Sequence, residues 1–274
     1  AVFNEASADA DFRIESNGNA DRLFVNGGDN TVLFGTQTTQ APGGDSYAVQ
    51  IFGTSLAEAG LTIMRGSADS GFPALVFSKS RNTTPGSNTI VADGDILGRI
   101  DFFADDGTNI NTPAARILAA VDGTPGENDM PATLKFYTTA DGAADVTEHF
   151  RIAPDGTLTG TDTSIGSNSD SRIKENIADF TYDLAKFKQL QPRTFDWKNP
   201  SQHNGASGNR GFVAQDVQAI DDYWVGEIEI EEGTLDYDLI PVGEKALTSK
   251  LGKKDAMYVS VINQLIARIE ALEG

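Results

Sequence analysis

A nine-residue stretch, residues 169–177, contains residue types that can cut a peptide bond. Ser169 lies five residues before Lys174, and Asp170 directly follows the serine. A serine hydroxyl becomes a nucleophile when a base takes its proton, and a lysine can be that base if burial lowers its pKa toward neutrality. Such Ser/Lys pairs are a known variant of the Ser-His-Asp triad. The stretch is therefore a candidate site of self-cleavage.

The spacing of Ser169 and Lys174 restricts how their side chains can meet. Residues five positions apart lie about 140° apart around a straight helix, and they face opposite sides of a strand. The pair meets only if the chain between them bends, if the long lysine reaches around, or if a neighbouring chain supplies the partner. The alternative is an ordinary turn or helix start, with Asp170 or Ser171 as its cap and Lys174 in solvent. On spacing alone, this alternative is favoured.

The region before the candidate site, residues 1–168, has the pattern of a mainly β structure. Short runs of branched and aromatic residues alternate with turn signals that contain Gly, Asp and Asn. The predicted strands are residues 12–16, 23–25, 32–34, 48–52, 61–64, 74–77, 96–103, 115–121, 133–137 and 150–152. Strands this short would leave exposed edges in a monomer, and three chains wrapped around one axis would cover them. We therefore expect a trimeric, fibre-like β domain.

The region after it, residues 169–274, has the pattern of a small α+β domain. Leucine and phenylalanine at helical spacing predict a helix before Pro192. Further elements are expected as strands at 194–198 and 211–214 and a short helix at 215–220. Alternating residues at 227–231 and 235–239 predict a hairpin around Glu232 and Gly233. Trp197 and Trp224 are expected to anchor the core.

The clearest predicted element is a C-terminal helix with a heptad pattern. Its apolar residues are spaced 4, 3, 4 and 3 apart: Tyr258, Ile262, Leu265, Ile269 and Leu272. Asp255 is a plausible N-cap. So short a helix is marginal alone and needs a packing partner. By pattern alone, a coiled coil between chains and an amphipathic helix packed on its own domain fit equally well.

Composition and charge exclude several classes of function. A net charge of -19 disfavours binding to nucleic acids and to anionic membrane surfaces. The absence of cysteine excludes disulfides and cysteine-ligated metals. The sequence contains no apolar run of membrane-spanning length. No cofactor or metal site is predicted, and a start without Met or a signal sequence indicates a fragment or a processed chain.

Three motifs in order connect this sequence to a known family. Residues 169–177 resemble the start of the endosialidase-type intramolecular chaperone, a self-cleaving Ser/Lys peptidase family at the C-terminus of phage tail fibres and tailspikes. Residues 190–198 look like its Leu-x-Pro-x-x-Phe-x-Trp-Lys segment, and residues 211–217 are similar to its Gly-Phe-x-Ala-Gln-x-Val segment. The C-terminal heptad helix also agrees. The resemblance covers residues 169–274.

The resemblance implies a specific role for the candidate site. Such a chaperone helps three chains fold in register and then releases itself by cutting before the motif serine. Carried onto this sequence, the scissile bond joins Asn168 to Ser169. Ser169 would be the nucleophile, Lys174 the general base, and Asp170 would position or polarise the site. The five heptad residues would form the trimer seam. Apart from this action on its own chain, no enzymatic activity is predicted.

The resemblance also implies a role for residues 1–168. They would form the distal part of a phage tail fibre that binds a host surface receptor, such as a glycan or an outer-membrane component. The protein would be a homotrimer in the virion, without nucleic-acid binding or membrane insertion. One alternative is a tailspike depolymerase, which needs two well-placed carboxylates to cut polysaccharide. Another is the fibre of a phage-tail-like injection particle.

Overall fold

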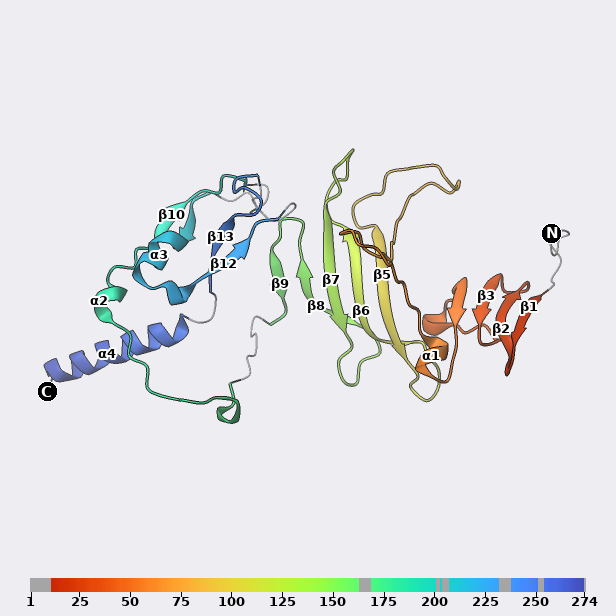
Figure 1. Cartoon of the computed structure of the whole chain (residues 1–274), viewed down its shortest axis with the longest axis horizontal. Coiled ribbons are helices and arrows are strands. Elements are labelled where there is room, and N and C mark those ends of the chain that lie inside the picture. Colours follow the sequence, from red (N-terminus) through yellow and green to blue (C-terminus); the bar gives the residue numbers. More distant parts are fainter. Residues whose placement is uncertain are drawn as a thin grey trace. The chain divides into compact units, whose positions relative to one another are not determined.

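The computed structural model describes residues 11–162, 169–200, 203, 207–231, 238–250 and 254–273. The chain divides into two compact units (Figure 1). The N-terminal unit comprises Ala1–Pro154 and Leu158–Asp162, and the C-terminal unit comprises Asp155–Thr157 and Thr163–Gly274. β-Sheets dominate the structure, and the last element is a helix. The predicted mainly β character is confirmed at this level.

The first sheet of the N-terminal unit follows the predicted strand pattern. It contains β1 (Phe12–Ser16), β2 (Asn19–Asn26), β3 (Thr31–Phe34) and β4 (Val49–Ile51), in that order. β1, β2 and β3 pair antiparallel, whereas β3 and β4 pair parallel. Leu33 is completely buried. The short helix η1 (Pro42–Gly44) lies in the connection between β3 and β4.

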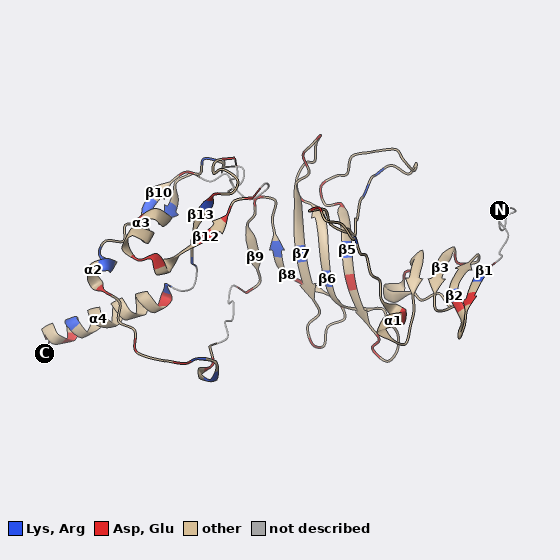
Figure 2. Ribbon diagram, in the orientation of Figure 1, with Lys and Arg blue, Asp and Glu red and all other residues tan. Residues whose placement is uncertain are grey.

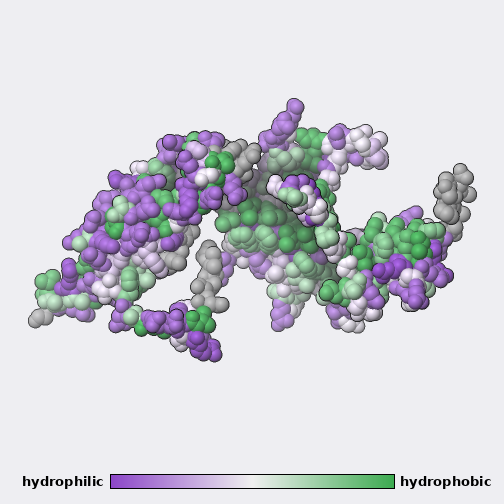
Figure 3. Space-filling model, viewed as in Figure 1, coloured by the Kyte–Doolittle hydropathy of each residue, from purple (hydrophilic) through white to green (hydrophobic). Residues whose placement is uncertain are grey.

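The second sheet of this unit is an antiparallel meander of five strands. Its strands are β5 (Ile96–Ala104), β6 (Thr112–Val121), β7 (Ala132–Thr138), β8 (Thr147–Ile152) and β9 (Leu158–Gly160). The register aligns Ile100, Ile117, Phe136 and Phe150 across four strands. Because side chains alternate between the faces of a strand, this row makes one face apolar. Figure 3 shows an apolar area over the same strands.

The opposite face of this sheet carries charged side chains. The next row of the register aligns Asp101, Arg116, Tyr137 and Glu148. Charged residues on β5 and β8 are visible in Figure 2. Cross-strand ion pairs therefore stabilise one face of the sheet, and apolar contacts stabilise the other.

Two predicted strands are wrong. Residues 61–64 and 74–77 lie in the long connection between α1 (Leu56–Ala59) and β5, and neither forms a strand. Their apolar side chains are exposed, with Met64 at 85% and Val76 at 77%. A strand exists only where a neighbour completes its hydrogen-bond ladder, and the described part of the chain places no partner strand there.

The C-terminal unit combines four short helices and one long helix among its described residues with two small sheets. Its helices are η2 (Ser171–Ile173), α2 (Leu184–Phe187), α3 (Ala214–Ile220), η4 (Asp222–Trp224) and α4 (Asp255–Glu273). Its antiparallel strand pairs are β10 (Arg193–Phe195) with β11 (Asn209–Gly211), and β12 (Val225–Glu229) with β13 (Lys245–Ser249). The predicted short helix at 215–220 is confirmed as α3.

The hairpin predicted for residues 227–239 is wrong. The partner of β12 is β13, which pairs Glu227 with Leu247. Leu239 lies in a turn, and residues 232–237 lie outside the described residues. The prediction for Trp197 is also wrong, because its side chain is 39% exposed, whereas Trp224 is buried as expected.

One buried cluster holds the C-terminal unit together. Its buried members are Tyr182, Val217, Trp224, Val225, Met257 and Val261. The start of α4 joins this cluster through polar contacts as well. The Ser260 hydroxyl accepts a hydrogen bond from the Tyr182 backbone N–H at 2.9 Å, and Gln264 donates one to the Tyr182 carbonyl at 2.9 Å. Helix α4 is therefore anchored to its own domain.

The N-cap predicted at Asp255 is wrong by one residue. The Tyr258 N–H bonds to the Lys254 carbonyl at 3.0 Å, so Lys254 occupies the cap position. Asp255 instead lies in the first turn, where its negative charge interacts favourably with the positive end of the helix dipole.

The buried residues that anchor α4 are not the heptad residues, although Tyr258 also packs edge-on against Phe187, with ring centroids 6.5 Å apart. Met257, Ser260 and Val261 are buried, whereas the heptad seam is exposed in the single chain. Within the seam, Tyr258 is the least exposed residue, at 37%, and Leu272 is the most exposed, at 87%. The helix therefore packs on its own domain with one face, and the described part of the chain leaves the predicted seam from Ile262 to Leu272 exposed. Among the described helices, none is both long and apolar enough to cross a bilayer.

Candidate active site

A bend in the chain brings the two predicted catalytic side chains together. The single-turn helix η2 lies between Ser169 and Lys174. Lys174 Nζ donates a hydrogen bond to Ser169 Oγ at 2.5 Å. Of the three ways in which the pair could meet, the structure has the first, a bend of the intervening chain.

Asp170 builds this bend. Its carboxylate accepts a hydrogen bond from the backbone N–H of Arg172 at 2.8 Å, which caps η2. The same carboxylate accepts two bonds from the Arg172 guanidinium, at 3.0 Å from Nε and 2.7 Å from Nη2. These side-chain bonds lower the pKa of Asp170 and raise that of Arg172. Asp170 directs its charge to Arg172, so its observed contacts fit a positioning role.

The candidate site is open to solvent in the single chain. Ser169, Asp170 and Lys174 are all exposed. A lysine acts as a base once it has lost its proton, and removal from water favours that loss. The contact is thus formed, but the apolar surroundings that activate such a pair are not supplied by the described part of this chain. Asn168, the predicted residue before the scissile bond, lies outside the described residues.

The structure contains a second Ser/Lys pair with the same spacing. Lys254 Nζ donates a hydrogen bond to Ser249 Oγ at 2.6 Å. The ammonium also lies 5.4 Å from the centroid of the Phe212 ring, which is within the range of a cation–π interaction. The spacing was visible in the sequence, but residues 249–254 match none of the three motifs, so the pair was not predicted.

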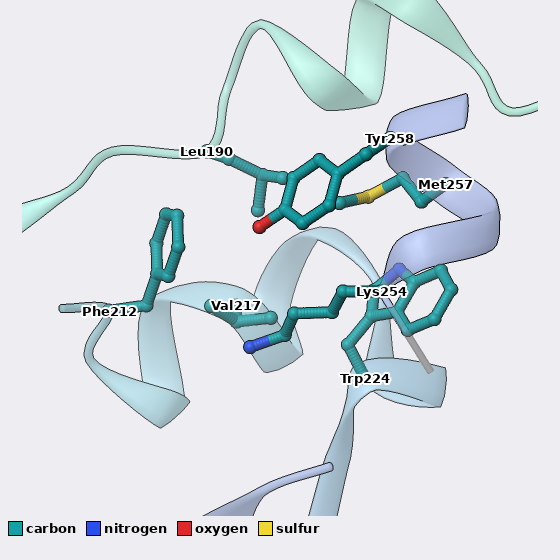
Figure 4. A pocket seen from close by; sticks show the side chains of 7 residues that line it. All are labelled: Leu190, Phe212, Val217, Trp224, Lys254, Met257 and Tyr258. Atoms are coloured by element: carbon teal, nitrogen blue, oxygen red, sulfur yellow. The ribbon is translucent and has the colours of Figure 1, made fainter. Parts of the chain in front are cut away.

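Lys254 extends into a small pocket of the C-terminal unit (Figure 4). The other residues that line it are Leu190, Phe212, Val217, Trp224, Met257 and Tyr258. The cavity has a volume of about 10 Å³, which is room for about one water molecule. It is therefore a packing defect of the core and not a substrate site.

The two downstream motifs pair with each other. β10, from the first motif, pairs with β11, which leads into the second, and Arg193 lies opposite Gly211. An ion pair joins Arg193 to Asp216 of the second motif, with Nη2 and Oδ2 3.0 Å apart. Motifs separated in the sequence therefore form one local structure beside the buried cluster.

Residues 169–226 match the model of the Peptidase_S74 family, described as the chaperone of endosialidase. The matched segment begins at Ser169 and includes Lys174, η2 and both downstream motifs. It ends at Gly226 in β12, before β13 and α4. The resemblance seen in the sequence is thereby confirmed for this segment.

Two solved structures of the bacteriophage T5 L-shaped tail fibre are also similar to this chain. Its carboxy-terminal domain matches at 14% identity with a TM-score of 0.39, covering 59% of this chain and 68% of that one. The same domain with its intra-molecular chaperone domain matches at 12% identity with a TM-score of 0.31, covering 78% of this chain and 64% of that one. The present chain thus spans less than two thirds of the second structure. No curated protein sequence matches the chain.

Proposed function

We propose that residues 169–274 are an intramolecular chaperone that aligns three copies of the chain and then releases itself. The observation that carries this proposal is the 2.5 Å contact between Lys174 and Ser169 at the first residue of the Peptidase_S74 match. The cut falls between Asn168 and Ser169, where the motif serine begins the matched segment.

The reaction is an acyl transfer followed by hydrolysis. The neutral Lys174 amine takes the proton of the Ser169 hydroxyl, and Oγ attacks the carbonyl carbon of Asn168. The bond from that carbon to the Ser169 nitrogen breaks, an ester to Oγ forms, and the nitrogen leaves as an amine after taking up a proton. Water then hydrolyses the ester to the Asn168 carboxylate and restores the serine hydroxyl. Because nucleophile and target belong to adjacent residues, proximity supplies much of the rate.

Assembly supplies what the single chain lacks. The heptad seam Tyr258, Ile262, Leu265, Ile269 and Leu272 is exposed, and so is the Ser169–Lys174 pair. Three-chain association would bury the seam and remove water from the pair, which favours the neutral amine. Cleavage would then follow correct assembly and not precede it.

Residues 1–168 form the distal region of a phage tail fibre that binds a host surface receptor. The β-rich unit upstream of the matched chaperone segment supports this role. Self-cleavage in the host cytoplasm would leave this region on the virion as a trimer and release the chaperone.

Intact mass spectrometry of the purified chain tests the proposal, with light scattering for its assembly. The wild type is expected to give a trimer and two fragments that meet at 168/169. Ser169→Ala is expected to stay whole. Ser249→Ala is the matched control, since it removes the other lysine-bonded serine, and it is expected to cleave like the wild type.

Two outcomes contradict the proposal. One is a wild-type trimer that stays uncut after prolonged incubation. This result would refute the proposed peptidase activity. The other is a monomer in solution, which removes the chaperone role. Equal cleavage of Ser169→Ala and the wild type would assign the cut to another residue.

A further inference from the structure

A pocket in the N-terminal unit lies between the loop that contains η1 and strand β5. Its volume is about 440 Å³, and it is lined by Pro42, Tyr47, Arg99, Asp101 and Phe103. Volumes of this size are typical of small-molecule sites. The pocket combines aromatic rings with charged hydrogen-bonding groups.

The loop is held against the sheet, so the pocket is built into the fold. The Gly43 N–H donates to the Ile110 carbonyl at 3.1 Å. Gly43 has a φ of 71° and lies so close to the Phe103 ring that an added Cβ would be 2.5 Å from its Cζ. Glycine is therefore required here both for its backbone conformation and for the close approach.

Two arginines contact the carboxylate of the pocket, and of these Arg99 lines the pocket and Arg116 does not. Asp101 is shared by Arg99 at 2.6 Å and Arg116 at 2.5 Å, so one anion faces two cations, a local sum of +1. The Asp101 side chain is 10% exposed and that of Arg99 is 38% exposed. Arg99 has five N–H donors and bonds Asp101 through Nε, so donors remain for a ligand.

The same two-to-one arrangement recurs further along this face of the sheet. Glu148 is shared by Arg151 at 2.5 Å and Lys135 at 3.8 Å. Figure 2 shows the charged positions on β5 and β8. In a chain with a net charge of -19, a face on which Asp101 and Glu148 each contact two cations is an exception that favours an anionic ligand, although Asp122 also lies near Arg151.

The aromatic side of the pocket narrows the ligand class. Tyr47 is 41% exposed, and Phe103 is half-buried beside it. An exposed tyrosine ring presents an apolar face and a polar hydroxyl, which suits a ligand with both characters. A sugar ring has an apolar C–H face and a polar rim, and an acidic sugar adds a carboxylate that an arginine can bind in bidentate fashion.

We propose that this pocket binds an acidic saccharide, with the sugar ring against Tyr47 and its carboxylate at Arg99. Asp101 holds Arg99 in place and accepts bonds from sugar hydroxyls. The proposal rests on the proposed function in one respect, because it names the receptor chemistry for a fibre that contacts a host surface.

The test is binding of the full chain to an array of defined oligosaccharides, with uronate- and sialate-containing members beside their neutral counterparts. The strongest acidic binder is then titrated by calorimetry. Arg99→Gln is expected to weaken binding roughly tenfold to a hundredfold, the range for one charged hydrogen bond. Tyr47→Ala is expected to weaken it severalfold, because it removes the ring against which the sugar lies. Phe72→Ala and Arg65→Gln are the matched controls, because both residues are exposed and lie outside the pocket, and they should bind like the wild type.

Several results would overturn the inference. These are no acidic binder on the array, equal binding of acidic and neutral members, or affinity that neither pocket substitution changes. The proposed function is judged separately by trimer formation and cleavage. A chain that assembles and cleaves but fails on the array refutes the pocket alone, whereas a monomeric, uncut chain refutes the chaperone whatever the array gives.

Discussion

The two Ser/Lys pairs of the C-terminal unit share their geometry but not their surroundings. The O–N distances are 2.5 Å for Ser169–Lys174 and 2.6 Å for Ser249–Lys254, and both pairs have the same spacing. The first lies in an exposed segment around one helical turn. The second joins the end of β13 to the start of α4, where Lys254 is half-buried near Phe212. A serine–lysine contact therefore does not by itself define a catalytic pair.

What distinguishes the first pair is its place in the chain. Ser169 begins the segment that matches the family model, whereas Ser249 and Lys254 lie beyond its end at residue 226. The fold of one chain already surrounds Lys254 in part, and Lys254 serves the packing of the core. In the proposed trimer, other chains would bury Lys174, which would couple its chemistry to assembly.

The largest expected difference between the two pairs appears when each lysine is replaced in turn and cleavage is measured. Lys174→Met is expected to slow cleavage by roughly a hundredfold to ten-thousandfold, the usual contribution of a general base. Lys254→Met keeps the length of the side chain and should cleave at the wild-type rate. Time courses of intact mass measure both, and similar slowing in the two variants would erase the distinction drawn here.

A similarly large effect is expected from the exposed seam of α4. Ile262→Asp places three charges together in the assembled helix bundle and should abolish the trimer and, with it, cleavage. Because Ile262 is 53% exposed in the single chain, the domain itself should stay folded. Light scattering and circular dichroism separate these outcomes.

The adjacent exposed position provides a control for the seam. Asn263→Asp adds the same side chain outside the heptad pattern and should trimerise and cleave normally. Cleavage of monomeric Ile262→Asp would show that the first pair is active without partners.

A smaller effect is expected from the core around Lys254. A substitution there should lower the stability of the C-terminal unit without stopping cleavage at the first pair. Met257 is 1% exposed and lines the pocket into which Lys254 extends. Met257→Ala is expected to lower the free energy of unfolding of this unit by about 2–5 kcal/mol, because it leaves a cavity. Denaturant unfolding measures the change, with the exposed Val259→Ala as control, and cleavage should persist wherever the unit stays folded.

The smallest effect concerns Asp170, whose capping bond forms the turn of the first pair. Asp170→Ala should slow cleavage severalfold, whereas Asp170→Asn, which can still cap, should slow it less. Both rates are measured by the same mass-spectrometric time course. Equal slowing of the two variants would show that the charge of the carboxylate matters and not its capping bond.

The pH dependence of this turn follows from the pKa of Asp170. Bonds from Arg172 lower the pKa of Asp170 from its ordinary value of 3.8. The carboxylate therefore stabilises the turn fully above that value and loses this contribution as the pH falls through the lowered pKa. Near neutrality, the turn should be insensitive to pH.

The sequence predicted most elements of the N-terminal unit because their apolar runs also have partners in the chain. Residues 61–64 and 74–77 have the same local pattern, and no partner within the described residues makes strands of them. Conversely, β13 has a weak pattern, Lys-Ala-Leu-Thr-Ser, and forms because β12 lies beside it. Local preference specifies what a segment can form, and tertiary pairing decides what it does form.

The candidate site was predictable in part for similar reasons. The residues and the need for a bend follow from spacing, and the motifs locate the family. The two-to-one sharing of Asp101 by arginines was not predictable, because Arg99 and Arg116 meet it through strand register. Predicting the second Ser/Lys contact would have required knowing that β13 ends just before α4 begins.

The unpaired runs at 61–64 and 74–77 bear on the solubility of the unassembled chain. Apolar, β-prone segments left exposed favour aggregation. Here Arg65 directly follows the first run, and Pro73 directly precedes the second, which Lys79 follows two residues later. Charges and a proline at such positions act as gatekeepers, because they oppose edge-to-edge stacking with stray copies. Both exposed apolar runs are thus flanked by residues of types that oppose fibril formation.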